Sequence, residues 1–272
     1  MPKLKVSNEV ELFYVDYGSG RPVVLIHGWP LSHKAWEPQV AALVDAGFRV
    51  IAYDRRGFGN SSAPWDGYDY DSFTGDLHEI MTQLDLKDAA LIGFSMGGGE
   101  VIRYLSKYGS ERVRKAVLVA SIIPLVAQKE DNPSGVPQSV FDEILEALKT
   151  NRPQFLVGFG KNFYNYSEEK QTVTPEQLQY DWSIAVHASP KATIGAAKAW
   201  MDTDFREEAS QIDVPVLIVH GDNDNTVPIA TSADQAARLI PDNVYKIYKD
   251  GSHGLNITHA DQLNKDLIEF LS

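Results

Sequence analysis

The sequence predicts an α/β fold in which a mostly parallel sheet is covered by helices on both faces and interrupted by a helical insertion. Short, continuously apolar runs alternate with segments of helical periodicity over about the first 120 residues. The alternation stops there and resumes near residue 214. Parallel strands that are buried on both faces form such continuous apolar runs, because helices cover both sides of the sheet.

The expected elements follow in chain order. Alternating polarity over 10–16 predicts an early antiparallel hairpin that ends at 18–20. Apolar and periodic runs predict strands at 23–26, 48–53, 89–92, 113–119, 214–219 and 244–248, and helices at 34–46, 70–84, 96–108 and 230–239. Thr258 is the expected N-cap of a closing helix, with Asp261 three residues later.

The segment 123–208 contains no strand-like run. Its prolines lie just before or within helix-like stretches, as at helix starts, and it is rich in aromatic residues. We interpret it as a helical cap inserted into a core domain formed by 1–122 and 209–272. Cap aromatics such as Phe159 are expected either to line a substrate pocket or to form the core of the cap itself.

Composition excludes several classes of function. The chain has 272 residues, a formal net charge of −12 and no cysteine. Thiol catalysis, disulfides and thiolate metal sites are therefore excluded, and an acidic surface repels nucleic acid. The sequence has neither the apolar run of about 20 residues that crosses a bilayer nor a signal peptide at its start. We expect a soluble, cytoplasmic protein without a membrane partner.

The run Gly93-Phe94-Ser95-Met96-Gly97 is a G-x-S-x-G motif between a predicted strand and a predicted helix. A serine at this tight turn presents its hydroxyl at a helix N-terminus, where the helix dipole favours a developing anion. The alternative is an ordinary serine N-cap between glycines. The strand–turn–helix context favours Ser95 as the nucleophile of a serine hydrolase.

A serine hydroxyl is a weak nucleophile that needs a base, and this motif's partners follow in the order Ser, Asp, His. His253 lies in a loop between the last predicted strand and the closing helix, and we expect it to be the base. Asp222 and Asp224 both precede it in a loop after a predicted strand. Asp224 is the preferred acid, and Asp222 is expected to bind local backbone N–H groups.

The backbone N–H groups of Trp29 and Met96 are the expected donors of an oxyanion hole. The alternative for Trp29 is a side chain packed beneath the cap, and both can hold. Pro30 fixes its own φ and allows a cis Trp29–Pro30 bond, which would turn the Trp29 carbonyl towards the acyl pocket. The expected substrate pocket residues are Trp29, Phe94, Phe159 and Val227.

Other motifs fail. A calcium loop starting at Asp222 would need glycine and glutamate where Val227 and Ala233 stand. The sequence contains no H-E-x-x-H zinc motif, and the three glycines 97–99 match neither a dinucleotide fingerprint nor a P-loop. The sequence therefore implies no cofactor and no metal.

With these residues in view, the chain resembles the α/β-hydrolase branch that holds the cofactor-free (non-heme) haloperoxidases, or perhydrolases, and the bacterial aryl esterases. The motifs that carry the resemblance are 24–30 (VLIHGWP), 53–59 (YDRRGFG), 93–99 (GFSMGGG), 203–206 (TDFR) and 220–224 (HGDND). It implies the α/β-hydrolase fold with a mostly parallel eight-stranded sheet. Transferred through the motifs, the catalytic triad would be Ser95, Asp224 and His253, with Trp29 and Met96 as oxyanion donors.

The resemblance also implies the chemistry. A small carboxylic ester would acylate the serine, and water would release the acid. In perhydrolases hydrogen peroxide competes with water and forms a peracid, which oxidises halide away from the protein. Relatives often self-associate, which leaves a homo-oligomer open. A lactamase or amidase would share every catalytic residue, and a non-catalytic ligand-binding member of the fold is the remaining alternative.

Overall fold

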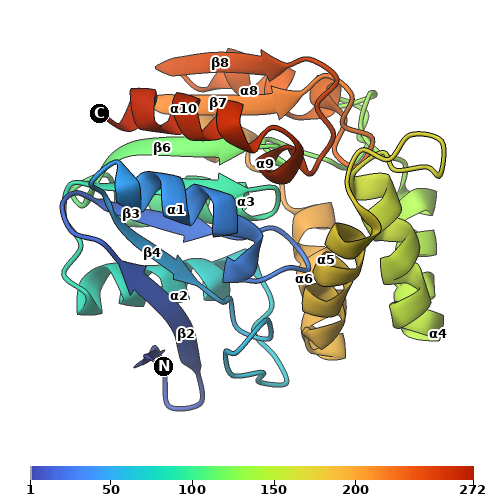
Figure 1. The fold of residues 1–272 in the computed structure, drawn as a ribbon, viewed down its shortest axis with the longest axis horizontal. Helices are drawn as coiled ribbons and strands as arrows, with labels where there is room; N and C mark the ends of the chain where they lie inside the picture. The colour runs from blue at the N-terminus through green and yellow to red at the C-terminus, as the bar shows by residue number, and fades with distance from the viewer. Residues whose placement is uncertain (1) are drawn as a thin grey trace.

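The computed structural model describes residues 2–272, which form one eight-stranded sheet between two layers of helices (Figure 1). The sheet order is β1-β2-β4-β3-β5-β6-β7-β8. Strands β1 and β2 pair antiparallel with their neighbours, and the other six pair parallel with one another. The mostly parallel eight-stranded sheet is thereby confirmed. The strands are β1 (Lys3–Lys5), β2 (Glu11–Tyr17), β3 (Pro22–Ile26), β4 (Arg49–Tyr53), β5 (Ala89–Phe94), β6 (Val113–Val119), β7 (Val216–Gly221) and β8 (Asn243–Tyr248).

Two hydrophobic cores lie on the two faces of the sheet. Successive side chains of a strand point to opposite faces, so β3 sends Val24 and Ile26 into one core and Val23 and Leu25 into the other. All four side chains are buried. Helices α2, α3 and α8 cover the first face, and α1 and α10 cover the second (Figure 1). The continuous apolar runs of the sequence therefore reflect burial on both sides.

The helices agree with the predicted ones to within a few residues. They are the 3₁₀ turns η1 (His33–Trp36) and η2 (Ile229–Thr231) and the helices α1 (Glu37–Asp45), α2 (Tyr70–Gln83), α3 (Gly97–Tyr108), α4 (Gln138–Phe163), α5 (Pro175–His187), α6 (Pro190–Asp202), α7 (Arg206–Ser210), α8 (Ala233–Leu239), α9 (Leu255–Thr258) and α10 (Ala260–Leu271). Over residues 2–272, none of them is long and apolar enough to span a membrane.

The expected N-cap at Thr258 is wrong. The Thr258 N–H already donates to the carbonyl of Gly254, so this residue ends the short helix α9. Its hydroxyl bonds the His259 ring instead of a backbone N–H, and His259 precedes α10. A separate turn of helix between β8 and α10 was not visible as periodicity, because four residues are too few to show it.

Helices α4, α5 and α6 lie together beyond the ends of β6 and β7, at the edge of the sheet where the parallel strands finish (Figure 1). Helix α4 bends at Asn151, whose φ of −153° is not helical, and Pro153 follows inside the helix. The Asn151 side chain accepts the N–H of Gln154 and so caps the second half of α4. Helix α7 spans residue 208, the predicted end of the cap, and the division into core and cap domains stays a prediction.

Candidate active site

Ser95 lies in the turn that joins β5 to α3, in a backbone conformation that non-glycine residues rarely adopt. Its φ is +53°. The Ser95 N–H donates to the carbonyl of Val119 over 2.9 Å, and its own carbonyl accepts the N–H of Gly98 over 3.1 Å. These bonds to a neighbouring strand and to the first turn of α3 hold the turn, and they place the Ser95 hydroxyl at the start of that helix.

The two glycines of the motif are required by space. A Cβ on Gly93 would lie 2.5 Å from the carbonyl oxygen of Gly97, and a Cβ on Gly97 would overlap the carbonyl oxygen of Ile26. Backbone atoms are the obstacle in both cases, so no side-chain movement could relieve the overlap. The turn can therefore approach α3 and β3 closely only because both positions are glycine.

Three of the predicted residues form one hydrogen-bonded chain. The Ser95 hydroxyl donates to Nε2 of His253 over 2.9 Å, and Nδ1 of His253 donates to Oδ2 of Asp224 over 2.7 Å. The three side chains come from the turn after β5, the loop after β8 and the loop after β7. The contact with Asp224 fixes the imidazole tautomer that leaves Nε2 free to accept the serine proton.

Asp224 is held as a carboxylate by its surroundings. Its other oxygen, Oδ1, accepts the backbone N–H groups of Thr226 and Val227 over 2.9 and 2.7 Å. Burial on its own raises the pKa of Asp224. The charge interaction with His253 and the hydrogen bonds from His220 and His253 outweigh burial and hold that pKa well below its ordinary value. The Asp224 side chain is therefore a carboxylate at neutral pH.

Asp222, the alternative acid, lies elsewhere in the same loop. Its carboxylate accepts the backbone N–H of Asp250 over 2.6 Å and so ties the loop after β7 to the loop after β8. It accepts a backbone N–H, but from a different loop rather than from the local backbone expected from the sequence. Of the two aspartates, only Asp224 touches an imidazole.

His220 is a residue of the site that sequence reasoning placed only in a turn. Its Nε2 donates to the carbonyl of Val227 over 2.9 Å and lies 3.3 Å from Oδ2 of Asp224. The ring is completely buried at the end of β7. Its Nε2–H thus points to the Val227 carbonyl beside Oδ2, the oxygen that accepts the His253 N–H. Its spacing of four residues from Asp224 was the available signal.

The expected oxyanion donors, Trp29 and Met96, lie on either side of the Ser95 turn. A Cβ added to Gly28 would lie 3.1 Å from Cβ of Ser95, so the loop that carries Trp29 runs directly beside the nucleophile. Within residues 2–272, neither the Trp29 N–H nor the Met96 N–H donates to a protein acceptor. Both amides are therefore available to a substrate oxygen. The Trp29–Pro30 peptide bond is cis.

A buried polar network supports the loop that carries Trp29. Arg55 and Glu100, both completely buried, form an ion pair behind it. The Arg55 guanidinium donates to the carbonyl of His27 over 2.7 Å, and the Arg55 N–H donates to Nε2 of the His27 ring over 3.0 Å. The other ring nitrogen donates to the carbonyl of Gly28. Burial, followed by the nearby Arg55 charge, lowers the pKa of His27 to about 3, so the ring stays neutral.

A cavity of about 340 Å³ lies beside the triad, between the cap helices and the loops that follow the strands. Trp29 and Phe159, two of the four residues that the sequence predicts for the substrate pocket, line this cavity. Phe94 packs instead against the His253 ring, and Val227 is buried beside Asp224, so neither belongs to this lining. Contact of these two residues with substrate stays a prediction. The Trp29 side chain also packs beneath the cap, because its indole N–H donates to the carbonyl of Thr193 in α6.

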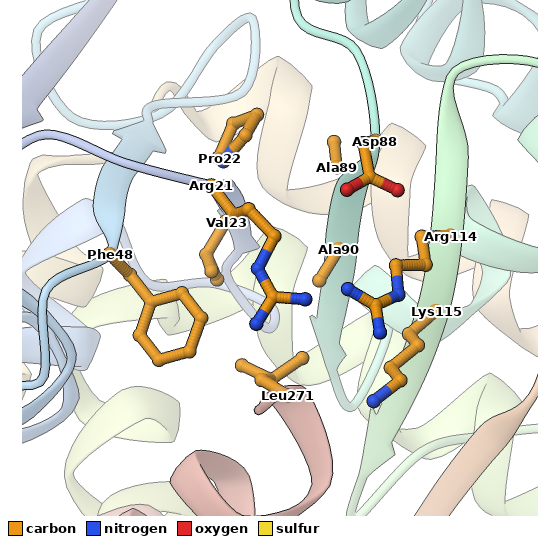
Figure 2. Close-up of a pocket in the computed structure, with 10 residues that line it drawn as sticks. All are labelled: Arg21, Pro22, Val23, Phe48, Asp88, Ala89, Ala90, Arg114, Lys115 and Leu271. Atoms are coloured by element: carbon orange, nitrogen blue, oxygen red, sulfur yellow. The ribbon is translucent and has the colours of Figure 1, made fainter.

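A second hollow lies at the opposite end of the sheet (Figure 2). It is bordered by Pro22 and Ala89, at the starts of β3 and β5, and by Leu271 at the end of α10. Its volume of about 10 Å³ is too small for an ester. Within residues 2–272, no group of three or more His, Cys, Asp or Glu side chains is arranged to hold a metal ion.

Comparison with known proteins places this chain in a family. The family model described as alpha/beta hydrolase fold matches residues 21–260. A non-heme chloroperoxidase of Kitasatospora aureofaciens is 42% identical, with 100% of both chains covered. A bifunctional esterase/perhydrolase of Acinetobacter calcoaceticus is 38% identical, with 96% of each chain covered. The crystal structure of a bromoperoxidase from Bacillus anthracis is 45% identical and superimposes with a TM-score of 0.96 over 99% of each chain.

These similarities extend over whole chains, and the motifs that carried the resemblance lie within the matched residues. The chain belongs to the alpha/beta hydrolase fold family, in the branch that contains non-heme haloperoxidases and an esterase/perhydrolase.

Proposed function

We propose that this protein is a serine hydrolase that cleaves small carboxylic esters through an acyl-enzyme and also forms peracids from hydrogen peroxide. The observation that carries the proposal is the hydrogen-bonded chain from the Ser95 hydroxyl through His253 to Asp224. Beside it lie the backbone N–H groups of Trp29 and Met96, which donate to no acceptor within residues 2–272. The relatives named as chloroperoxidase and as esterase/perhydrolase support the same chemistry. They do not favour a lactamase or amidase.

Each step has a residue to perform it. Nε2 of His253 takes the hydroxyl proton as Oγ of Ser95 attacks the ester carbonyl carbon. The carbonyl oxygen becomes an anion that accepts hydrogen bonds from the Trp29 and Met96 amides. As the carbon–oxygen bond to the alcohol breaks, the imidazolium returns its proton to the leaving alcohol. The acyl group then remains as an ester of Ser95.

Release of the acyl group repeats the chemistry with a new nucleophile. Water gives a proton to His253 and attacks the acyl carbon, which yields the carboxylic acid and regenerates the Ser95 hydroxyl. Hydrogen peroxide in place of water yields a peracid by the same bond changes. The peracid leaves the site and oxidises bromide or chloride in solution, while the peracid itself is reduced to the carboxylic acid.

The test compares the wild type with Ser95→Ala in two assays, one with a short aryl ester and one with acetate, hydrogen peroxide and bromide. Both activities should fall by at least about 10³-fold in Ser95→Ala, because the nucleophile and the acyl-enzyme are lost together. Ser183→Ala is the control, since its exposed hydroxyl bonds only the Tyr180 carbonyl. Ester turnover that survives in Ser95→Ala would overturn the proposal.

Two expectations about the protein's surroundings stay proposals. The self-association of relatives supports a homo-oligomer, which light scattering of the purified protein would test. A cytoplasmic location is proposed because the chain has no cysteine, as suits a reducing compartment, and fractionation of cells that express the untagged protein would test it.

A further inference from the structure

The cavity beside the triad is apolar and uncharged. None of the described residues that line it carries a charge. Its lining consists of Trp29, Val126, Val136, Val140, Phe141, Ile144, Phe155, Gly158, Phe159, Asn162, Trp200, Asn225, Thr226 and Pro228. Such a lining stabilises an aryl or alkyl group and disfavours an ionised one, which would lose its hydration without gaining a partner.

Two residues connect the cavity to the proposed catalytic groups. Trp29 contributes its side chain to the lining and its backbone N–H to the proposed oxyanion hole. Thr226 also lines the cavity, and its N–H donates to the carboxylate of Asp224. We therefore expect a group that extends from an ester carbonyl held at Ser95 to reach this cavity.

The second half of α4 presents two different faces. Phe155, Gly158, Phe159 and Asn162 line the cavity. Their spacing of three and four residues places them on one side of a helix. The residues 156, 157, 160 and 161 line a separate groove between α4 and α5, on another side of the same helix. Gly158 and Gly160 are thus two glycines of one helix that face two different spaces.

Gly158 is not required by the packing of the chain. Glycine inside a helix costs roughly 0.5–1 kcal/mol relative to alanine. Nothing lies within 4 Å of a Cβ added at Gly158, and its φ is not in the left-handed region. Neither a close approach nor the backbone conformation explains this glycine. Gly158 is exposed, and it lines the cavity.

We propose that Gly158 sets the size of the group that this enzyme accepts, by leaving the cavity open for a large uncharged aryl or alkyl part of the ester. A cavity of about 150 Å³ lined by Leu, Ile and Phe binds benzene. The cavity of about 340 Å³ therefore has room for a group on the order of two fused aromatic rings. This inference rests on the proposed ester hydrolysis and adds the substrate class.

The experiment narrows the cavity at one position. In Gly158→Leu, nothing lies within 4 Å of the new Cβ, and we expect the leucine side chain to extend into the cavity that Gly158 lines. Gly160→Leu is the matched control, because nothing lies within 4 Å of its added Cβ and Gly160 lines the groove between α4 and α5 and a hollow of about 20 Å³ beside Pro30 rather than this cavity. Both substitutions replace a helix-interior glycine by a good helix former, so both variants should fold with unchanged or higher thermal stability.

Each variant is assayed with two series of esters. One keeps acetate and enlarges the alcohol from phenyl to naphthyl, and the other keeps p-nitrophenol and lengthens the acyl chain. In Gly158→Leu, kcat/KM for the largest member of at least one series should fall at least about tenfold, while kcat/KM for phenyl acetate changes less than about twofold. In Gly160→Leu, kcat/KM for the largest esters and for phenyl acetate should match the wild-type values.

The outcomes separate this inference from the proposed function. If Gly158→Leu and the wild type prefer the same sizes in both series, or if Gly160→Leu shows the same loss, the cavity does not hold the substrate and the inference is overturned. The proposed ester hydrolysis would survive that result. If the wild type hydrolyses no ester, both fail. The rates at which short-chain and long-chain alkyl fluorophosphonates label Ser95 give a second readout of size preference.

Discussion

The neutral His27 predicts how the stability of this protein depends on pH. Its ordinary pKa of about 6.5 is lowered to about 3 in the folded chain, chiefly by burial and then by the Arg55 charge. Between these two values the unfolded chain binds a proton at His27 that the folded chain does not. Because the folded pKa is the lower one, the contribution of neutral His27 to the free energy of unfolding is fully present above pH 6.5. It is lost as the pH falls from there towards the folded pKa.

The size of the loss follows from these values. On lowering the pH from 7.0 to 4.5, the unfolded His27 becomes almost fully protonated while the folded ring stays neutral. The linkage relation then gives a loss of about 2.5 kcal/mol in the free energy of unfolding from this residue alone. Any folded pKa below about 4 gives nearly the same result, because the folded ring is still uncharged at pH 4.5.

Equilibrium urea unfolding at pH 7.0 and 4.5, followed by tryptophan fluorescence, measures the loss. The variant His27→Gln keeps a donor and an acceptor at this position but cannot titrate. Between pH 7.0 and 4.5 its free energy of unfolding should therefore fall by about 2–3 kcal/mol less than that of the wild type. Ile26→Val, the neighbouring buried residue, is the control for lower stability without a change in titration, and it should lose as much as the wild type. Equal losses in His27→Gln and the wild type would refute the reasoning.

Two further predictions concern the triad and the turn that carries it. Asp224→Asn should lower kcat by about 10³–10⁴-fold, because an amide no longer fixes the tautomer of His253; steady-state ester hydrolysis checks this, and a variant with a tenth of wild-type kcat would contradict it. Gly93→Ala should lower the free energy of unfolding by about 2 kcal/mol or more and abolish activity, because its Cβ would lie 2.5 Å from the Gly97 carbonyl oxygen. Thermal unfolding and activity measured together test it, and wild-type values in both would show that the turn has room.

The fold and the Ser95 turn could be predicted because their causes are local in sequence. Strands buried on both faces give continuous apolar runs, and the glycine motif around Ser95 is contiguous in sequence, although Gly97 is required by the distant Ile26 carbonyl as well as by the turn itself. The choice between Asp222 and Asp224 was harder, since both occupy one loop. The structure separates them by which carboxylate reaches the His253 ring.

The supporting residues of the site depend on contacts between distant parts of the chain. The pairing of Arg55 with Glu100 crosses 45 residues and appears only once β4 and α3 are packed together. His220 could have been recognised by its spacing from Asp224, but a histidine at a strand end is more often structural. The cavity could not be derived, because the side of α4 that faces Trp29 is set by the bend at Asn151 and by packing between helices.

The acylation of Ser95 is the central claim, and peptide mass spectrometry after rapid quenching tests it most directly. The wild type is mixed with excess p-nitrophenyl acetate, quenched in acid within the first turnovers and digested for mapping. The wild type should show a transient gain of one acetyl group on the peptide that contains Ser95. The adduct should live longer in His253→Ala, which lacks the base for its hydrolysis, and Ser95→Ala should show no gain. An acetyl group mapped to another residue, or ester turnover at wild-type rate without any acetylated Ser95, would contradict it.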